Sequence, residues 1–564
     1  MNNHTYLRAF SALGLALSLP AHVHAQSMSY GGGSSADAGD DEGDTSDDKR
    51  SSRSGKKLTV TPYIEAAQVA TARLSPGSDT LTYSTIAAGI DASIQGRNTK
   101  GAISARYERR IGYGNAASGD TISGVARIGT TIIPNALNIE AGALAARSQV
   151  ENNGQTVLGT PVGGNSSTQI YSVYAGPTIK TRAGDVAIDG GYRIGYTKVG
   201  TDAGVITAPG GPAFDVFDHS ISQNAEIHAG VKPGAMLPVG VGVGAGYYQE
   251  DISNLDQRVR DLHARADVTL PLTGDLALVG GVGYEKVQVS SRDVARDGTG
   301  APIIGSNGRY VTDKSGPRVM SYDTSGLIWD AGVMWRPSKR TALEAHVGRR
   351  YGSMTYYGSF AYAPSKSSSI NVSVYDGITG FGGLVNNALA NMPTEFQAAR
   401  NPLTGEITGC VVAQAAGSCL GGVLGSVRSS VFRSRGVTAS YGKDLGRFQA
   451  GFGGGYDRRK FIGAPGTILA LANGVTDENV WLSAYLNGRI DQQSSFATNF
   501  YSSWYQSGEA SAGDFSAIGA SAAYNRNLTG KLAATAALGL ESISRETVDD
   551  QVTASALVGV RYSF

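Results

Sequence analysis

Apolar and polar residues alternate with a period of two along much of the chain, most clearly in residues 262–270. One side carries Leu262, Ala264, Ala266, Val268 and Leu270, and the other carries His263, Arg265, Asp267 and Thr269. Successive side chains of a β-strand point to opposite faces, so this pattern predicts a strand with one apolar face and one polar face. A charge facing lipid at mid-depth costs about 2–4 kcal/mol, so such a strand in a membrane turns its apolar face outward.

Residues 551–564 show the same alternation and end on aromatic side chains. The apolar face carries Val552, Ala554, Ala556, Val558, Val560, Tyr562 and Phe564, and Leu557 is the exception on the polar face. A strand of this length can cross a membrane obliquely. The ending Gly559-x-x-Tyr562-x-Phe564 resembles the C-terminal signal of Gram-negative outer-membrane β-barrels, which implies recognition by the outer-membrane barrel assembly machinery.

Short and long connections alternate between the predicted strands. Short turns are predicted at residues 98–100, 134–138, 182–185, 272–275, 337–340, 364–367, 443–447, 491–493 and 528–531. Longer connections fall at residues 151–166, 200–217, 291–320, 377–428 and 462–476. Outer-membrane barrels have tight periplasmic turns and longer external loops, so the order of lengths predicts about 22 strands, within a range of about 18 to 24.

These patterns predict an all-β protein in which residues 58–564 form a single transmembrane antiparallel β-barrel, with short periplasmic turns and long extracellular loops. The alternative is a soluble β-sandwich or β-helix, which would need neither a terminal aromatic residue nor tyrosines near strand ends. The 564-residue length is compatible with one barrel, because each strand adds only about ten to fifteen residues and a loop. The 77 glycines and the excess of 27 tyrosines over 14 phenylalanines favour half-apolar strands with aromatic girdles.

The beginning of the chain reads as an export signal followed by an acidic tether. Residues 1–25 contain Arg8, an apolar stretch over residues 10–19 and a small-residue site ending at Ala25, as in a cleaved signal peptide. Residues 26–57 are rich in Gly, Ser and acidic residues, so we expect a disordered periplasmic tether. A calcium or cationic-partner site in this tether is an alternative. No run of eighteen apolar residues occurs later in the sequence, so no transmembrane helix is predicted.

The two cysteines, Cys410 and Cys419, lie close together in a loop-like stretch. After an export signal they favour a disulfide in an oxidising compartment, and their spacing matches no redox or zinc motif. The net charge of +1 and the lack of a basic tract exclude a nucleic-acid partner.

Charged residues on the predicted polar faces are candidates for the pore lining. They are Arg106, Glu108, Arg110, Asp189, Arg193, His263, Arg265, Asp267, Glu344, His346, Arg350, Asp457 and Arg459. Basic and acidic groups along a pore select permeants by charge. The other interpretation is that they pair with one another and fill space.

The insertion at residues 377–428 is apolar in patches and poor in charge, and long loops of this kind are commonly functional. Our hypothesis is that it folds into the mouth or lumen as a constriction, held by the disulfide and packed on a glycine-lined wall. Alternating glycines at residues 240–246 and 451–455 would leave room for another backbone. The alternative is a cap on the external surface.

Enzymatic motifs are absent from the sequence. His219, His228, His263 and His346 are scattered, and no Gly-x-Ser-x-Gly, HExxH or metal-ligand spacing occurs. We therefore expect neither an enzyme nor a metal or cofactor.

Four segments, residues 335–344, 347–352, 360–365 and 60–65, together resemble a set of proteobacterial outer-membrane barrels found with exopolysaccharide systems. The resemblance covers the barrel from about residue 58 and implies an envelope role without assigning a residue to it. The expected function is a porin-like channel for polar solutes. The alternatives are a barrel for exopolysaccharide export or attachment and a non-transporting adhesive or structural barrel. Outer-membrane lipid, lipopolysaccharide, polysaccharide and small polar solutes are the expected partners.

Overall fold

The strands of the chain close into one ring. The computed structural model describes residues 57–150, 156–158, 167–201, 216–365, 367–412, 418–419, 422–509, 513–546 and 548–564, so the predicted signal peptide and almost all of the predicted tether lie outside the described residues. Its main sheet has 23 strands, of which the short β6 lies in a loop, so 22 antiparallel strands form the ring. The ring closes where β1 (Lys57–Ser75) pairs with both β2 (Asp79–Gln95) and β26 (Val548–Ser563).

The other strands of the ring follow one another in chain order. They are β3 (Thr99–Tyr113), β4 (Gly119–Ile133), β5 (Leu137–Val150), β7 (Ser167–Ala183), β8 (Val186–Thr201), β9 (His219–Val231), β10 (Gly240–Ile252), β11 (Gln257–Pro271), β12 (Leu276–Ser291), β13 (Val319–Ser338), β14 (Thr341–Arg350), β15 (Ser353–Ser365), β16 (Ser368–Thr379), β20 (Phe432–Asp444), β21 (Phe448–Phe461), β22 (Thr476–Arg489), β23 (Ser494–Gln506), β24 (Phe515–Asn527) and β25 (Leu532–Arg545).

Smaller elements lie in the connections. They are β6 (Thr156–Leu158), the helix α1 (Phe381–Ala390), β17 (Gln397–Arg400), β18 (Ile407–Val412), β19 (Ser418–Cys419) and the 3-10 turns η2 (Asn254–Asp256), η3 (Val423–Gly425) and η4 (Ile468–Ala472). Among the described residues, no helix is long and apolar enough to span a bilayer.

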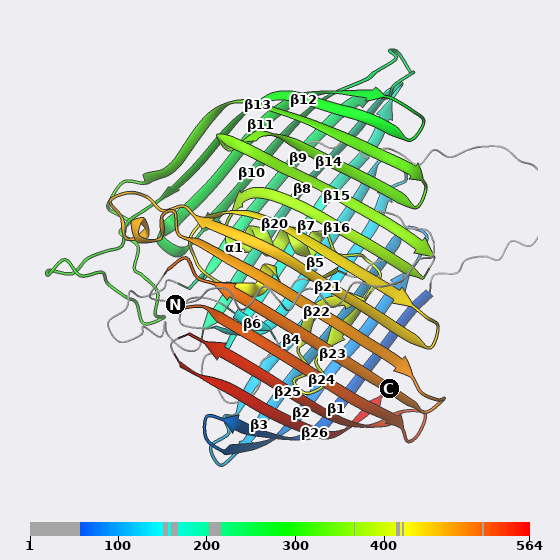
Figure 1. Ribbon diagram of the computed structural model, residues 1–564, viewed down its shortest axis with the longest axis vertical. Helices are drawn as coiled ribbons and strands as arrows, with labels where there is room; N and C mark the ends of the chain where they lie inside the picture. Colours follow the sequence, from blue (N-terminus) through cyan, green and yellow to red (C-terminus); the bar gives the residue numbers. More distant parts are fainter. Residues whose placement is uncertain are drawn as a thin grey trace, which may run out of the picture.

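The two ends of the ring differ in their connections, as the turn lengths predict. Short turns join β2 to β3, β11 to β12 and β24 to β25 at the end where β1 begins and β26 ends, on the right of Figure 1. The longest described loop that projects from the ring, residues 292–318, lies at the opposite end, on the left of the figure. We name these the short-turn end and the long-loop end. The long-loop end also has tight connections, at residues 76–78, 253–256 and 351–352. In the last of these, Tyr351 and Gly352, with φ of 53° and 65°, form a two-residue hairpin turn.

The outer face of the ring is apolar and the inner face is polar. On β11, Leu262 and Val268 are exposed on the outside, whereas Asp261, Arg265 and Asp267 are buried on the inside. Exposed aromatic side chains lie towards both ends of the outer face. Towards the long-loop end they include Tyr107, Tyr113, Tyr171, Tyr196, Tyr284, Trp329, Tyr356 and Trp504, and at the short-turn end they include Trp335, Phe448, Tyr524, Tyr562 and Phe564. Tyr192, Phe452 and Phe500 are exposed between the two ends.

Candidate functional site

A closed ring of 22 strands with an apolar exterior leaves no sheet edge exposed to lipid, so the chain is a transmembrane β-barrel of the bacterial outer membrane. Its candidate functional site is the lumen. Short turns are periplasmic in such barrels, which places the short-turn end in the periplasm and the long-loop end outside the cell.

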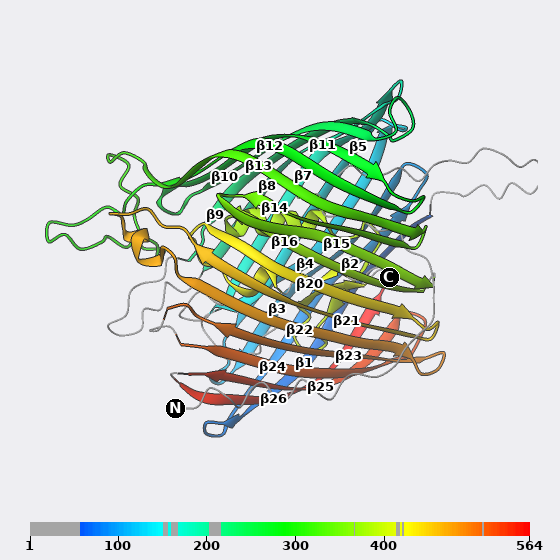
Figure 2. The same ribbon diagram turned by 45° about the horizontal axis from the view of Figure 1, so that its top comes forward.

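The connection between β16 and β20 folds into the lumen. β16 continues through Thr379 and β20 begins at Phe432, so this segment covers residues 380–431 rather than the predicted residues 377–428. We name it the lumen insertion. Figures 1 and 2 show α1 inside the ring in both views.

Helix α1 is held on the inner wall by Asn386. The Asn386 Oδ1 accepts a hydrogen bond from Ser172 Oγ at 2.9 Å, and its Nδ2 donates to Thr197 Oγ1 at 3.2 Å and Ser222 Oγ at 3.1 Å. These hydroxyls come from β7, β8 and β9. A Cβ on Gly195 would lie 2.4 Å from Asn386 Nδ2, so the helix can approach this closely only because β8 carries glycine there.

The amino-terminal end of α1 is held by Glu250 of β10, which is fully buried. Its carboxylate accepts hydrogen bonds from the backbone N–H groups of Gly380 at 2.7 Å and Gly383 at 2.9 Å. Ser220 and Tyr248 donate their hydroxyls to the same carboxylate, at 2.9 and 2.7 Å. A carboxylate at a helix N-terminus satisfies N–H groups that have no partner within the helix, and it complements the helix dipole.

An apolar cluster at the long-loop end buries the other side of α1. Phe381, Val385 and Leu389 are each fully buried, and the ring of Phe381 lies edge-on to Phe217 with centroids 5.2 Å apart. Fully burying such a side chain stabilises a structure by about 1.5–3 kcal/mol relative to leaving it exposed. Helix α1 is therefore firmly packed on the wall.

After α1 the lumen insertion reaches the short-turn end. Glu395 Oε1 lies 3.1 Å from Lys100 Nζ, and Gln95 Nε2 donates to Glu395 Oε2 at 3.4 Å. Gln95 and Lys100 flank the turn between β2 and β3, whereas Thr379 and Phe432 lie at the long-loop end. The insertion thus runs through the lumen from one end to the other.

The chain then turns back through the hairpin of β17 and β18. Arg400 donates to Ser123 Oγ at 2.8 Å and to Ser104 Oγ at 3.0 Å, on β4 and β3. Asn499 of β23 donates to the Arg400 carbonyl at 3.3 Å. The end of the hairpin therefore contacts two separate parts of the inner wall.

The returning part of the lumen insertion is held by two arginines. Arg459 of β21 donates to the carbonyls of Gly422 at 2.9 Å and Ser426 at 3.2 Å. Arg428, in the insertion, donates to Asp477 and Glu509, both at 2.9 Å. Attachments to β3, β4, β7 to β10 and β21 to β23 place the insertion across the lumen.

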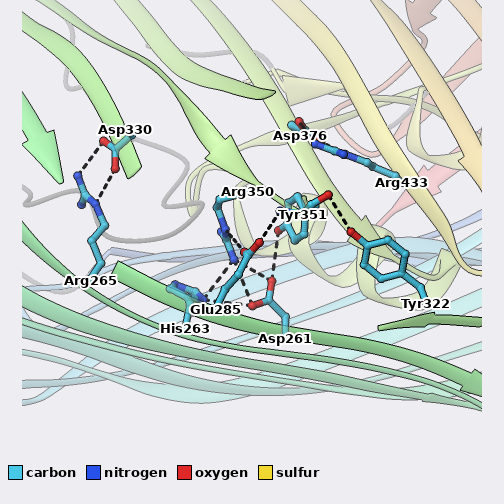
Figure 3. A network of polar contacts seen from close by, with 10 residues as sticks. All are labelled: Asp261, His263, Arg265, Glu285, Tyr322, Asp330, Arg350, Tyr351, Asp376 and Arg433. Atoms are coloured by element: carbon cyan, nitrogen blue, oxygen red, sulfur yellow. Dashed lines mark hydrogen bonds and ion pairs between the residues drawn. The ribbon is translucent and has the colours of Figure 1, made fainter. Parts of the chain in front are cut away.

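A second polar region covers the inner wall from β11 to β20, and Figure 3 shows it from close by. Arg350 donates to Asp261 Oδ2 at 2.9 Å and to Glu285 Oε2 at 3.1 Å. Nearer β20, both nitrogens of the Arg433 fork donate to Asp376, each at 2.7 Å. Paired, charge-assisted contacts of this kind fix the position of both side chains.

The same region contains an arginine, aspartate and histidine in contact. Arg265 binds Asp330 through two nitrogens at 2.7 and 2.8 Å, and His346 Nδ1 lies 2.9 Å from Asp330 Oδ2. The other ring nitrogen of His346 lies 3.2 Å from Glu344 Oε1. Arginines and carboxylates contact one another on this part of the wall, which makes the inner surface strongly polar.

The structure places all the sequence-derived pore-lining candidates on the inner face, in four groups. Arg106, Glu108 and Arg110 lie on β3, Asp189 and Arg193 on β8, Asp457 and Arg459 on β21, and His263, Arg265, Asp267, Glu344, His346 and Arg350 on β11 and β14. The first three groups lie against or near the lumen insertion, as Arg193 shows by donating to Asn387 of α1 at 3.3 Å. Of the fourth group, Figure 3 draws His263, Arg265 and Arg350.

Sequence reasoning missed Glu250, Asn386, Asp261, Glu285 and Asp330, which hold the insertion and the network together. Asp261 shares the alternating face of His263 and Arg265, so its parity was a usable signal. Glu250 shares the alternating face of the glycines at residues 240–246, so parity placed it in the lumen but did not reveal its partners at α1. Asn386 gives no local signal, because its partners come from distant strands.

The glycine runs have a different use from the one predicted for them. A Cβ on Gly242 or Gly246 would lie within 2.5 Å of the ring of His228 or His263, and a Cβ on Gly451 would lie 2.5 Å from the Tyr485 hydroxyl. These glycines accommodate rings from neighbouring strands rather than another backbone. The close approach to the lumen insertion occurs elsewhere, at Gly195 and Gly539, where a Cβ would lie 2.3 Å from Leu403 Cδ1.

Cys410 and Cys419 are register partners in the antiparallel pair of β18 and β19. Their side chains lie outside the described part of the chain, so the disulfide stays a prediction. At the carboxy-terminus, the rings of Tyr562 and Phe564 lie edge-on with centroids 5.1 Å apart, and the Phe564 N–H donates to the Pro62 carbonyl at 3.0 Å. Gly559 faces inward, where a Cβ would lie 2.7 Å from the Ala67 Cβ.

Comparisons with known proteins find similar overall shapes only. No family model and no curated protein sequence matches the chain. Among solved structures, the chain is similar to the FrpB iron transporter from Neisseria meningitidis, with 12% identity, 89% of this chain and 82% of that chain covered, and a TM-score of 0.41. It is also similar to the ferric-catecholate import receptor Fiu from E. coli K12, with 9% identity, 89% and 81% coverage, and a TM-score of 0.40. Nothing about the ligand of this chain follows from these likenesses.

Proposed function

We propose that the protein is an outer-membrane channel for polar solutes whose lumen is closed by its own insertion. The observation that carries this proposal is the path of residues 380–431, from Thr379 at the long-loop end to Lys100 near the short-turn end and back. A paired, charged inner wall supports water and polar solutes rather than apolar ones. The channel is therefore gated rather than permanently open, which refines the porin-like function expected from the sequence.

The test replaces the lumen insertion by a short turn. Thr379 and Phe432 are register partners of β16 and β20, so a two-residue Asn-Gly turn can join them without moving the strands. We expect planar bilayers containing the full chain to show low conductance and the variant lacking residues 380–431 to show large, stable pores. Swelling of liposomes in neutral sugars and in salts then measures which polar solutes pass.

A matched control shortens the external loop at residues 297–301, whose flanking residues Arg296 and Pro302 are bridge partners, and keeps Arg309, which binds the carbonyls of Val216 and Phe217. We expect this control to keep the low conductance of the full chain. Equal, low conductance for both shortened variants would overturn the channel and favour a non-transporting surface barrel. The link to exopolysaccharide export stays a prediction, and passage of oligosaccharides through the variant lacking the insertion would favour it.

A further inference from the structure

The two halves of the lumen insertion are attached to the barrel in different ways. Helix α1 is held by the buried carboxylate of Glu250, by Asn386 and by fully buried apolar side chains. We name residues 393–407, which follow α1, the gate segment. Its buried apolar side chains are Phe396 and Ile407, and its other contacts with the wall are mainly polar or charged.

Glu395 of the gate segment pairs with Lys100, but within the described part of the chain the charges of Arg400 and Glu406 lack a close partner of opposite sign. The described residues place no carboxylate in hydrogen-bonding contact with the Arg400 guanidinium, which binds hydroxyls and carbonyls only. Arg106 lies close by, because a Cβ on Gly405 of the segment would fall 2.4 Å from Arg106 Cζ. Two guanidinium groups thus flank the same turn.

Glu406 has the complementary deficiency. It is buried, its Oε1 lies 3.7 Å from Arg147 Nε, and its Oε2 has no hydrogen-bond partner among the described residues. Burying a charge without good hydrogen bonds costs free energy that hydration would return. Glu406 would therefore gain from moving into a water-filled lumen, and Arg400 could exchange its neutral acceptors for water, whereas Glu250 and Asn386 would lose good partners.

One apolar contact fixes the tip of the gate segment. Leu403 lies against Gly539 on the inner face of β25 and packs against the apolar cluster that contains Ala523 and Ala537. A Cβ on Gly539 would lie 2.3 Å from Leu403 Cδ1, so the contact exists only because β25 carries no side chain there.

From these observations we propose that the gate segment is the moving part of the channel, while α1 remains on the wall. It swings away from β3 and β4 and from β23 and β25, and solutes pass along the wall that it leaves. This inference rests on the proposed function, since it names the part of the insertion that opens and closes the lumen.

The test fills the socket of Leu403 from the wall. A Gly539→Val variant places a side chain where Leu403 lies, and valine is favoured in strands, so the barrel itself should remain folded. Overpacking of this kind disfavours the closed position, and we expect the open probability in planar bilayers to rise by about tenfold or more. A second change, Leu403→Ala, makes room for the valine and should return the double variant to low conductance.

The matched control is Gly326→Val, on the inner face of β13, where a Cβ would contact nothing within 4 Å. It should leave the conductance unchanged. Suppose that the variant lacking residues 380–431 conducts but Gly539→Val conducts no more than the unchanged protein. That result would overturn the proposal that the gate segment moves, and the proposed channel function would stand. If that deletion variant does not conduct either, the proposed function itself fails.

Discussion

The carboxylate of Glu250, on the barrel wall, accepts the backbone N–H of Gly383, in the first turn of α1, at 2.9 Å. The two residues are 133 positions apart, and one belongs to a transmembrane strand and the other to a helix inside the lumen. The first N–H groups of such a helix have no partner within the helix, so they depend on the buried carboxylate as their hydrogen-bond acceptor.

Replacing Glu250 by glutamine should loosen the whole lumen insertion. The amide keeps one acceptor oxygen, but it loses the negative charge that accepts the N–H groups of Gly380 and Gly383. A hydrogen bond to a charged group contributes about 1.5–3 kcal/mol to stability, so its loss weakens the attachment of α1. We expect conductance steps approaching those of the variant without residues 380–431. Glu344→Gln is the control, because Glu344 is also a lumen carboxylate but pairs with His346 of the wall. Equal conductance of the two variants would contradict the role of Glu250.

Replacing Arg350 by methionine should destabilise the barrel without opening the channel. The change leaves Asp261 and Glu285 buried without their cation, and breaking a buried pair in this way costs about 3–5 kcal/mol. The measurement is the urea midpoint of the purified protein in lipid vesicles. Arg260→Gln, at an exposed position of the same strand as Asp261, should shift the free energy of unfolding by no more than about 0.5 kcal/mol.

Cys410 and Cys419 should form a disulfide in the exported protein. Directly opposite residues of an antiparallel pair have Cα atoms about 4.5–5.5 Å apart, within the range of a disulfide. Intact mass after maleimide treatment should show no label without a reductant and two labels with one. Two labels on the unreduced, denatured protein would show that the cysteines are free.

The external loop of residues 292–318 should lose order in acid. Hydrogen bonds from Thr299 and from the Ala301 N–H lower the pKa of Asp297, and Ser315 lowers the pKa of Asp313 in the same way. A carboxyl whose folded pKa lies below its unfolded value, about 3.9, stabilises the loop above that pH, and the contribution disappears as the pH falls through the folded pKa.

Limited digestion by pepsin from pH 5 to pH 2 checks this expectation, since cleavage within the loop should appear only in the lower part of that range. The double variant Asp297→Asn and Asp313→Asn should be cleaved to the same extent at each pH, after correction for the activity of pepsin on an unfolded substrate. Cleavage of the unchanged protein that does not depend on pH would contradict the role of these carboxylates.

The strands and the topology could be predicted from the sequence because they depend on local alternation. Residues 262–270 and 551–564 alternate as the structure requires, and even the exception Leu557 is an inward residue packed near Val69 and Tyr83. The longest connections lie at one end of the ring as predicted, although residues 76–78, 253–256 and 351–352 form tight turns at the same end. Because a shift of one residue in register would turn the apolar side chains of a strand to the polar face, the alternation fixes how neighbouring strands pair.

The interior could be predicted only in outline. Helix α1 contains two glycines and no charged residue, so neither helix propensity nor an amphipathic pattern marks it. It is stable because Glu250 of β10 accepts its N–H groups and Asn386 finds partners on β7 to β9, which depends on the register of strands far away in the chain. The same holds for Arg350, whose two carboxylates lie 65 and 89 residues before it.

Thr379 and Phe432, where the lumen insertion leaves and rejoins the wall, are opposite one another on neighbouring strands. A folded unit whose two ends lie this close together can be exchanged without changing the scaffold that carries it. The lumen insertion could therefore be replaced by another folded domain with adjacent termini, such as a small ligand-binding domain. In such a channel, binding of the ligand to the grafted domain would be measured as a change in electrical current.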